Sequence, residues 1–130
     1  LFNEKNNGET VLKLNAEGLI NSLHDVSLGG IITAVSKMAI KGKKGFKLNK
    51  PKVLINKFDY YFGEDQGRYI IEIEPKNLSK VQKILKDNSV HYDEIGLVTE
   101  KDIILDKEPI IHIDDLVKSN TNWLKEYMDK

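Results

Sequence analysis

Hydrophobic and polar positions along the chain follow helical and strand periods in turn. Apolar residues at helical spacing predict a helix over residues 8–17, which Gly18 is suited to end in a left-handed conformation. A short apolar run predicts a strand over residues 19–23. The widest apolar stripe predicts a helix over residues 27–40, packed on a sheet and ended by Gly42.

The middle of the chain predicts two further strands and a helix. Phe46 and Leu48 alternate with lysines, which indicates a short strand. Residues 69–74 predict a strand with one solvated face, because Ile71 and Ile73 alternate with Glu72 and Glu74. Asn77 is suited to cap a helix that ends near residues 87–88. The type of the apolar run at residues 53–55 stays open.

The C-terminal third predicts short strands and a terminal helix. The strands are expected over residues 92–98, 102–105 and 109–113. Residues 114–117 predict a turn or short helix, after which Thr121 is expected to cap the terminal helix. Interleaved helices and strands with several antiparallel neighbours predict the α+β class, a layered α/β/α fold with a mixed sheet.

Length and composition predict one globular domain. The chain has 130 residues, 40% hydrophobic and 31% charged. Residues 1–7 are polar and predict a linker or frayed end, which leaves a single domain over residues 8–130. The first residue is Leu rather than Met, so the chain can be a trimmed protein or a piece of a longer polypeptide.

The charge balance gives no sign of a nucleic-acid or membrane partner. Lysine plus arginine and aspartate plus glutamate number 20 each, so the formal net charge is zero. No apolar run approaches the length of a membrane span. The chain has no cysteine, which fits a cytoplasmic location. The basic residues 41–44 can be a solvated turn or a phosphate contact.

Residues 24–30, here called the glycine-pair segment, carry the first candidate site. His24, Asp25 and Ser27 follow the predicted strand, at the end where open α/β sheets bind ligands. Gly29 and Gly30 then open a helix, whose free N–H groups suit an anion. His24 and Asp25 can equally brace the loop or cap the helix. The glycines can equally allow close packing.

Residues 63–68, here called the acidic loop, carry the second candidate site. Two carboxylates, an amide and a guanidinium lie between glycines. Such a loop can bind Mg²⁺ or a polar substrate, with Arg68 pairing a phosphate or carboxylate. It can also be a hairpin-like turn with solvated charges. Its candidate residues are Gly63, Glu64, Asp65, Gln66 and Arg68.

Other chemical signatures are absent from the sequence. His91 and His112 are isolated, and no histidine spacing typical of zinc sites occurs, so no metal site is predicted. No nucleotide-binding glycine motif is present. Trp123 can anchor a core or contact a neighbouring domain.

These residues together carry a family resemblance. The glycine-pair segment resembles the HDVSDGG box of the C-terminal domain shared by aminoimidazole ribonucleotide (AIR) synthetase and its relatives. Residues 62–69 resemble the FGEDQGRY box of one branch, the phosphoribosylformylglycinamidine (FGAM) synthases. Residues 95–98 are similar to the family's IGxV strand, and the tail around Trp123 resembles the end of the synthetase subunit. The resemblance covers nearly the whole chain.

The resemblance implies the last domain of an ATP- and glutamine-dependent ligase of purine biosynthesis. The catalytic residues, with the main ATP and Mg²⁺ ligands, then lie in other domains, and this domain alone is inactive and binds neither cofactor tightly. The implied partners are the preceding domains, a glutaminase subunit and a small accessory subunit. The residues that the resemblance places at the cleft, beside an auxiliary nucleotide site, are His24, Asp25, Ser27, Gly29, Gly30, Gly63, Glu64, Asp65, Gln66 and Arg68.

One position departs from the family pattern. Leu28 stands where the family usually has Asp, and an apolar side chain neither binds metal nor accepts a hydrogen bond. Related synthetases remain an alternative: AIR synthetase, a hydrogenase maturation factor or thiamine phosphate kinase. The FGEDQGRY-like box argues against these. A non-catalytic scaffold domain is the alternative of a different class.

Overall fold

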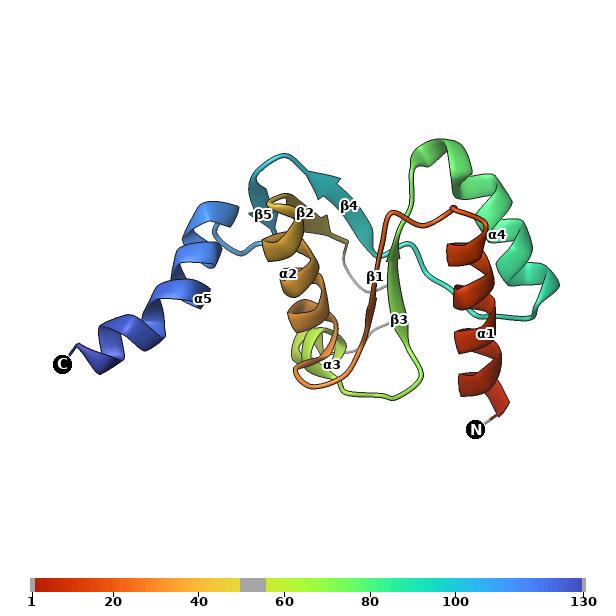
Figure 1. The fold of residues 1–130 in the computed structure, drawn as a ribbon, viewed down its shortest axis with the longest axis horizontal. Coiled ribbons are helices and arrows are strands. Elements are labelled where there is room, and N and C mark those ends of the chain that lie inside the picture. The colour runs from red at the N-terminus through yellow and green to blue at the C-terminus, as the bar shows by residue number, and fades with distance from the viewer. Residues whose placement is uncertain (1, 50–55, 130) are drawn as a thin grey trace. The chain divides into compact units, whose positions relative to one another are not determined.

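The computed structural model describes residues 2–49 and 56–129, so the apolar run at residues 53–55 lies outside the described part. The chain forms two compact units, residues 1–38 with 55–94 and residues 39–54 with 95–130. The elements, labelled in Figure 1, are α1 (Phe2–Ala16), β1 (Ser22–Asp25), α2 (Gly30–Gly42), β2 (Gly45–Leu48), α3 (Lys57–Phe62), β3 (Tyr69–Glu72), the 3-10 turn η1 (Pro75–Asn77), α4 (Leu78–Asp87), β4 (Gly96–Thr99), β5 (Asp102–Ile104), β6 (Ile111–His112) and α5 (Ile113–Met128).

Helix α1 ends as predicted but begins earlier. Gly18 has φ +66°, and its N–H donates to the Asn15 carbonyl at 3.0 Å. The Leu19 N–H donates to the Leu14 carbonyl at 3.1 Å, which completes a Schellman C-cap. Residues 2–7, predicted as a linker or frayed end, belong to the helix, so that prediction is wrong. The single domain over residues 8–130 stays a prediction.

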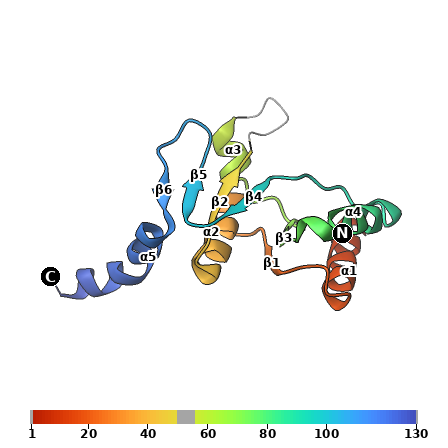
Figure 2. The same ribbon diagram turned by 90° about the horizontal axis from the view of Figure 1, so that it is seen from above.

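The core of the first unit lies between α1 and α4. Leu14, Leu19, Val81 and Leu85 form a buried cluster, and Ile71 is among the half-buried residues that pack against it. Figures 1 and 2 show the two helices side by side. Asn77 precedes α4 as predicted, but its side chain makes no capping hydrogen bond.

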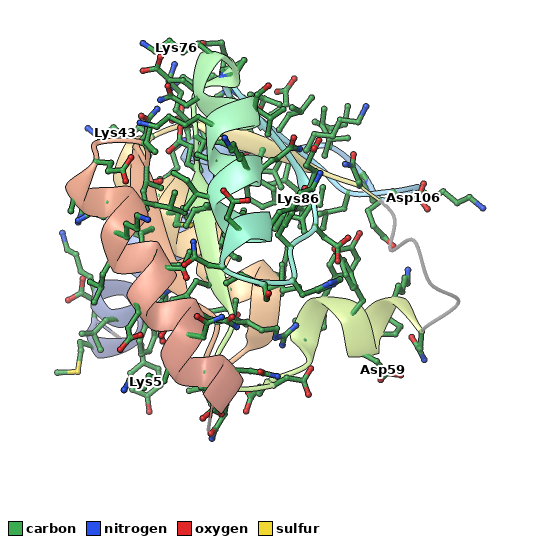
Figure 3. All side chains as sticks on the ribbon, turned by 90° about the vertical axis from the view of Figure 1, so that its right-hand side faces the viewer. Lys5, Lys43, Asp59, Lys76, Lys86 and Asp106 are labelled. Carbon is green, nitrogen blue, oxygen red and sulfur yellow. The ribbon has the colours of Figure 1, made fainter. Side chains whose placement is uncertain are left out.

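Charged side chains lie on the outer surface of the first unit. Lys5 of α1 and Lys76 of η1, labelled in Figure 3, have side chains that are 76% and 73% exposed. Each pairs with a glutamate on its own stretch of chain. Exposed pairs of this kind contribute little to stability, so burial between the helices dominates the folding of this unit.

Strands β1 and β3 form an antiparallel pair in the first unit. Ser22 pairs with Glu72 and Asp25 pairs with Tyr69. The strand expected over residues 19–23 therefore begins at Ser22 and includes His24, a correction of three residues. The strand begins later than predicted because Leu19 already belongs to the C-cap of α1 and to the buried core between the helices.

The second unit contains a four-stranded mixed sheet in the order β4-β2-β5-β6. Strand β2 runs antiparallel to β4 and parallel to β5, so it separates two strands that are consecutive in the sequence. Phe46, Leu48 and Ile103 are buried in this sheet. A Cβ on Gly45 would overlap the backbone of Asp102, so glycine permits the close approach of β2 and β5. The predicted α+β class with a mixed sheet is confirmed.

Helix α5 is one continuous helix, contrary to the predicted turn and second helix. His112 is its N-cap, and Asp114 and Asp115 occupy its first turn, where acidic side chains favour a helix start. Thr121, predicted as a cap, lies inside the helix and donates its hydroxyl to the Val117 carbonyl at 2.9 Å. Trp123 is 60% exposed, so its predicted role as a core anchor is wrong.

None of the helices among residues 2–49 and 56–129 combines the length and apolarity that crossing a membrane requires.

Of the basic residues 41–44, Lys41 lies in the last turn of α2, and Lys44, just after the helix, forms an exposed ion pair. Lys44 Nζ donates to Glu100 Oε2 at 2.8 Å. This hydrogen bond and the lysine charge lower the pKa of the Glu100 carboxyl below its usual range. A lowered carboxyl pKa means that the pair favours folding above the ordinary pKa of glutamate and loses this effect as the pH falls through the lowered value.

We expect Lys44→Met to raise the pKa of Glu100 towards that of a free glutamate. The variant removes both the hydrogen-bond donor and the positive charge. A carboxyl-carbon NMR titration measures the midpoint, and Lys43→Met is the control for a lost neighbouring lysine charge. An unchanged midpoint in Lys44→Met would show that the ion pair does not form in solution.

Candidate functional site

The glycine-pair segment and the acidic loop lie side by side in the first unit. Antiparallel pairing of β1 with β3 brings the end of β1 beside the start of β3, with Asp25 opposite Tyr69. The Val26 N–H donates to the Arg68 carbonyl at 2.9 Å, which extends this pairing. The resemblance places both stretches at one cleft, and these contacts confirm that the stretches lie together.

An open pocket of about 410 Å³ lies between these two stretches. Of the predicted site residues, five line it: Asp25, Ser27, Glu64, Gln66 and Arg68. The other five do not: His24, Gly29, Gly30, Gly63 and Asp65. The rest of the lining comprises Val26, Leu28, Gly67 and Tyr69. The strand register, which sequence periodicity does not supply, is what brings Tyr69 to Asp25.

A carboxylate from the acidic loop occupies the start of α2. Glu64 Oε1 accepts a hydrogen bond from the Gly29 N–H at 2.8 Å. This N–H group is one of the donors that an external phosphate would use, and a second anion beside Glu64 would be repelled. A side chain of the protein itself therefore takes one of the donors at this helix start, and the phosphate site stays a prediction.

Gly30 allows α2 and α3 to approach closely. Its φ is +69°, and a Cβ there would lie 2.6 Å from the backbone carbonyl oxygen of Tyr61 and 2.6 Å from the carbonyl carbon of Phe62. Real Cβ atoms essentially never approach so closely. Of the two roles that the sequence left open, close packing is the one that the geometry supports.

Arg68 holds the acidic loop closed. Its Nη2 donates to the Gly63 carbonyl at 2.6 Å and its Nε donates to the Asp65 carbonyl at 3.1 Å. Nη2 also lies 3.4 Å from the Asp65 carboxylate. Since one guanidinium carries five N–H donors, some remain for a ligand in the pocket. Arg68 therefore shapes the loop and contributes positive charge to the pocket wall.

The shortest contact of His24 is with the backbone carbonyl of Asp25 and not with its carboxylate. His24 Nδ1 lies 2.6 Å from the Asp25 carbonyl and 3.4 Å from the Asp25 carboxylate. Because a carbonyl oxygen only accepts, Nδ1 carries the proton in this contact. The bracing role that the sequence left open therefore describes His24, whereas Asp25 also lines the pocket.

No metal ligand set appears in the described part of the first unit. No group of three or more histidine, cysteine, aspartate or glutamate side chains gathers in residues 2–49 and 56–129. Burial, with smaller effects from Tyr61 and Asp93, raises the pKa of the Tyr60 phenol above its usual value. The pocket thus offers hydrogen-bonding oxygens and one guanidinium, which suit contact with a polar ligand.

We expect Glu64→Ala to lower the free energy of unfolding by about 1 kcal/mol, as the loss of a helix cap does. Glu64→Gln, which keeps an oxygen acceptor without the charge, should lose less. Urea denaturation measures both. Gln66→Ala is the control for a truncated exposed side chain in the same loop, and equal losses in Glu64→Ala and Gln66→Ala would contradict the contact with Gly29.

A family model described as "AIR synthase related protein, C-terminal domain" matches residues 1–106. Phosphoribosylformylglycinamidine synthase subunit PurL of Pelagibacter ubique is 64% identical over 129 residues, which are 99% of this chain and 18% of that subunit. The same subunit of Bartonella henselae is 32% identical over 96% of this chain and 17% of its own length. The chain therefore spans about a fifth of the curated relatives that it matches.

Solved structures support the same fold. The structure "T. maritima PurL complexed with FGAR" aligns with a TM-score of 0.74 and 20% identity, over 88% of this chain and 21% of that chain. The structure of PurLQS from Thermotoga maritima aligns with a TM-score of 0.73 and 21% identity, over 88% of this chain and 21% of that chain. The family model covers most of the sequence, and the fold agrees with these structures. The chain therefore belongs to the AIR synthase related family, as a copy of its C-terminal domain.

Proposed function

We propose that the chain is the C-terminal domain of an FGAM synthase, the ligase that converts formylglycinamide ribonucleotide to formylglycinamidine ribonucleotide in purine biosynthesis. The observation that carries this proposal is the 64% identity to a PurL subunit along 99% of the chain. In this reaction ATP phosphorylates the amide oxygen of the substrate, and ammonia from glutamine then displaces the phosphate. This domain is not active alone, since the chain spans only about a fifth of its relatives.

The pocket between the two stretches is the part of this domain that faces ligand or the preceding domains. Asp25, Glu64 and Gln66 offer oxygen atoms, and Arg68 adds a positive charge. The oxygen atoms suit the hydroxyls of a nucleotide, and the guanidinium of Arg68 suits its phosphates. ATP and Mg²⁺ act in the whole enzyme, at a site built mostly by other domains.

The proposed partners are the preceding domains, a glutaminase subunit and a small accessory subunit, in the cytoplasm. A solved assembly named PurLQS, whose PurL chain shares this fold, supports the subunit partners. The balanced charge of the chain supports the absence of nucleic-acid and membrane partners.

The test compares the 130-residue chain with the full polypeptide that its gene encodes. Each is assayed for ADP release and for FGAM formation with ATP, Mg²⁺, formylglycinamide ribonucleotide and ammonia. We expect FGAM formation by the full polypeptide and none by the chain alone. Turnover by the chain alone, or a full polypeptide that uses a different substrate, would overturn the proposal.

A scaffold role for the two stretches is the second candidate function. Glu64 is bonded to Gly29, and Arg68 is bonded within its own loop, so both already stabilise the domain. Asp25→Asn in the full polypeptide separates the two roles, because Asp25 lines the pocket and lies outside the acidic loop. A raised KM for ATP or for the ribonucleotide supports ligand contact, whereas unchanged kinetics support the scaffold role.

A further inference from the structure

The apolar stripe of α5 is covered at one end and uncovered at the other. Ile113 is fully buried, and Leu116 and Val117 are half-buried. At the same helical spacing the stripe continues into a part that we call the exposed stripe: Trp123, Leu124, Tyr127 and Met128, with exposed fractions of 60%, 54%, 70% and 73%. Figure 2 shows this end of α5 extending away from β6.

The exposed stripe has the chemistry of an interface core. It holds two aromatic side chains, a leucine and a methionine, and no charge. Trp, Tyr and Met are enriched at the centres of protein interfaces, and contiguous exposed apolar patches mark interaction surfaces. The opposite side of the helix, with Asn122 and Glu126, is polar. This division is typical of a helix that buries one side against another surface.

Helix α5 lies outside the part of the chain common to the wider family. The family match ends at residue 106, before Ile113, whereas the match to the Pelagibacter ubique subunit covers 99% of the chain. The helix is therefore shared with the Pelagibacter ubique subunit beyond the general domain. About four-fifths of that subunit lies outside this match, and this remaining part offers a large surface that can cover the stripe.

We propose that the exposed stripe docks on an apolar surface in the remaining part of the same synthetase polypeptide. The inference rests on the proposed function, which makes this chain one domain of that polypeptide. Four side chains cover several hundred Å² on one side, below the roughly 800 Å² that each partner buries in a standard interface between separate proteins. A surface in the same polypeptide is held at a high effective concentration, so a contact of this small area is enough for it to bind the stripe.

Hydrogen-exchange mass spectrometry of the full polypeptide tests the docking. Peptides from residues 118–129 are expected to exchange at least about tenfold more slowly than the unstructured rate. In Leu124→Glu this protection should be lost, because a charge enters the apolar contact. Asn122→Glu adds the same charge on the polar side of the same helix and should keep the protection.

Each outcome separates the docking from the proposed function. Exchange at the unstructured rate in a polypeptide that still forms FGAM overturns the docking alone. Protection without FGAM formation overturns the proposed function but leaves the docking. Protection that appears only when the other subunits are added, or that rises with protein concentration, overturns the assignment to the same polypeptide. Equal loss in Leu124→Glu and Asn122→Glu shows a general helix effect and also overturns it.

Discussion

Val81→Asp is expected to unfold the first unit at room temperature. Val81 is 1% exposed and belongs to the buried cluster between α1 and α4, with Leu14 and Leu85. An unpaired carboxylate in such a site costs several kcal/mol, against a total stability of about 5–15 kcal/mol for a domain. Circular dichroism during thermal and urea denaturation measures the loss.

The matched control for this substitution is Ser79→Asp. It adds the same charge to the same helix at an exposed position in the first turn, where an acidic side chain is favourable. We expect its stability to equal or slightly exceed that of the parent. If Val81→Asp and Ser79→Asp melt together, the cluster between the two helices does not stabilise the unit.

Gly30→Ala is expected to lower the free energy of unfolding by about 3 kcal/mol or more. A residue with a Cβ at positive φ costs about 1–2 kcal/mol. Overlap of that Cβ with the backbone of Tyr61 and Phe62 adds about 1–3 kcal/mol, because backbone atoms have little room to move. The α2–α3 contact should therefore open, and urea denaturation measures the change.

Gly18→Ala measures separately the stability cost of placing a Cβ at positive φ. Gly18 has a φ of +66°, close to that of Gly30, but no atom lies within 4 Å of its added Cβ. We expect a loss of about 1 kcal/mol there. The difference between the two variants measures the close approach of the helices. Equal losses would mean that α3 moves away from Gly30 without cost.

Local sequence patterns predicted most elements, because the periodicity of an element and the residues that cap or end it lie close together in the sequence. The Gly18 C-cap and the apolar face of α4 are of this kind, and the strand predicted over residues 69–74 exists but ends at Glu72. Thr121 shows where such signals fail. A threonine hydroxyl inside a helix can bond the carbonyl four residues earlier, so its side-chain type alone does not locate a helix start.

The candidate site required pairings between residues far apart in the sequence. Composition and resemblance selected both stretches, and their convergence was predicted. The contact of Glu64 with Gly29 spans 35 positions and depends on the register of β1 with β3. Sequence periodicity does not contain that register. For the same reason Tyr69, opposite Asp25 in the pairing, was not among the candidate residues.

The central position of β2 also has a consequence for synthesis on the ribosome. Phe46 pairs with Val98 on one side and with Ile103 on the other, so both partners of β2 are translated long after it. The first unit is complete at residue 94, before either partner emerges. Chains fold from the N-terminal end as they are made, and non-local strand pairs form slowly. The apolar β2 segment must therefore wait unpaired on the nascent chain, where it is exposed to chaperones and to aggregation.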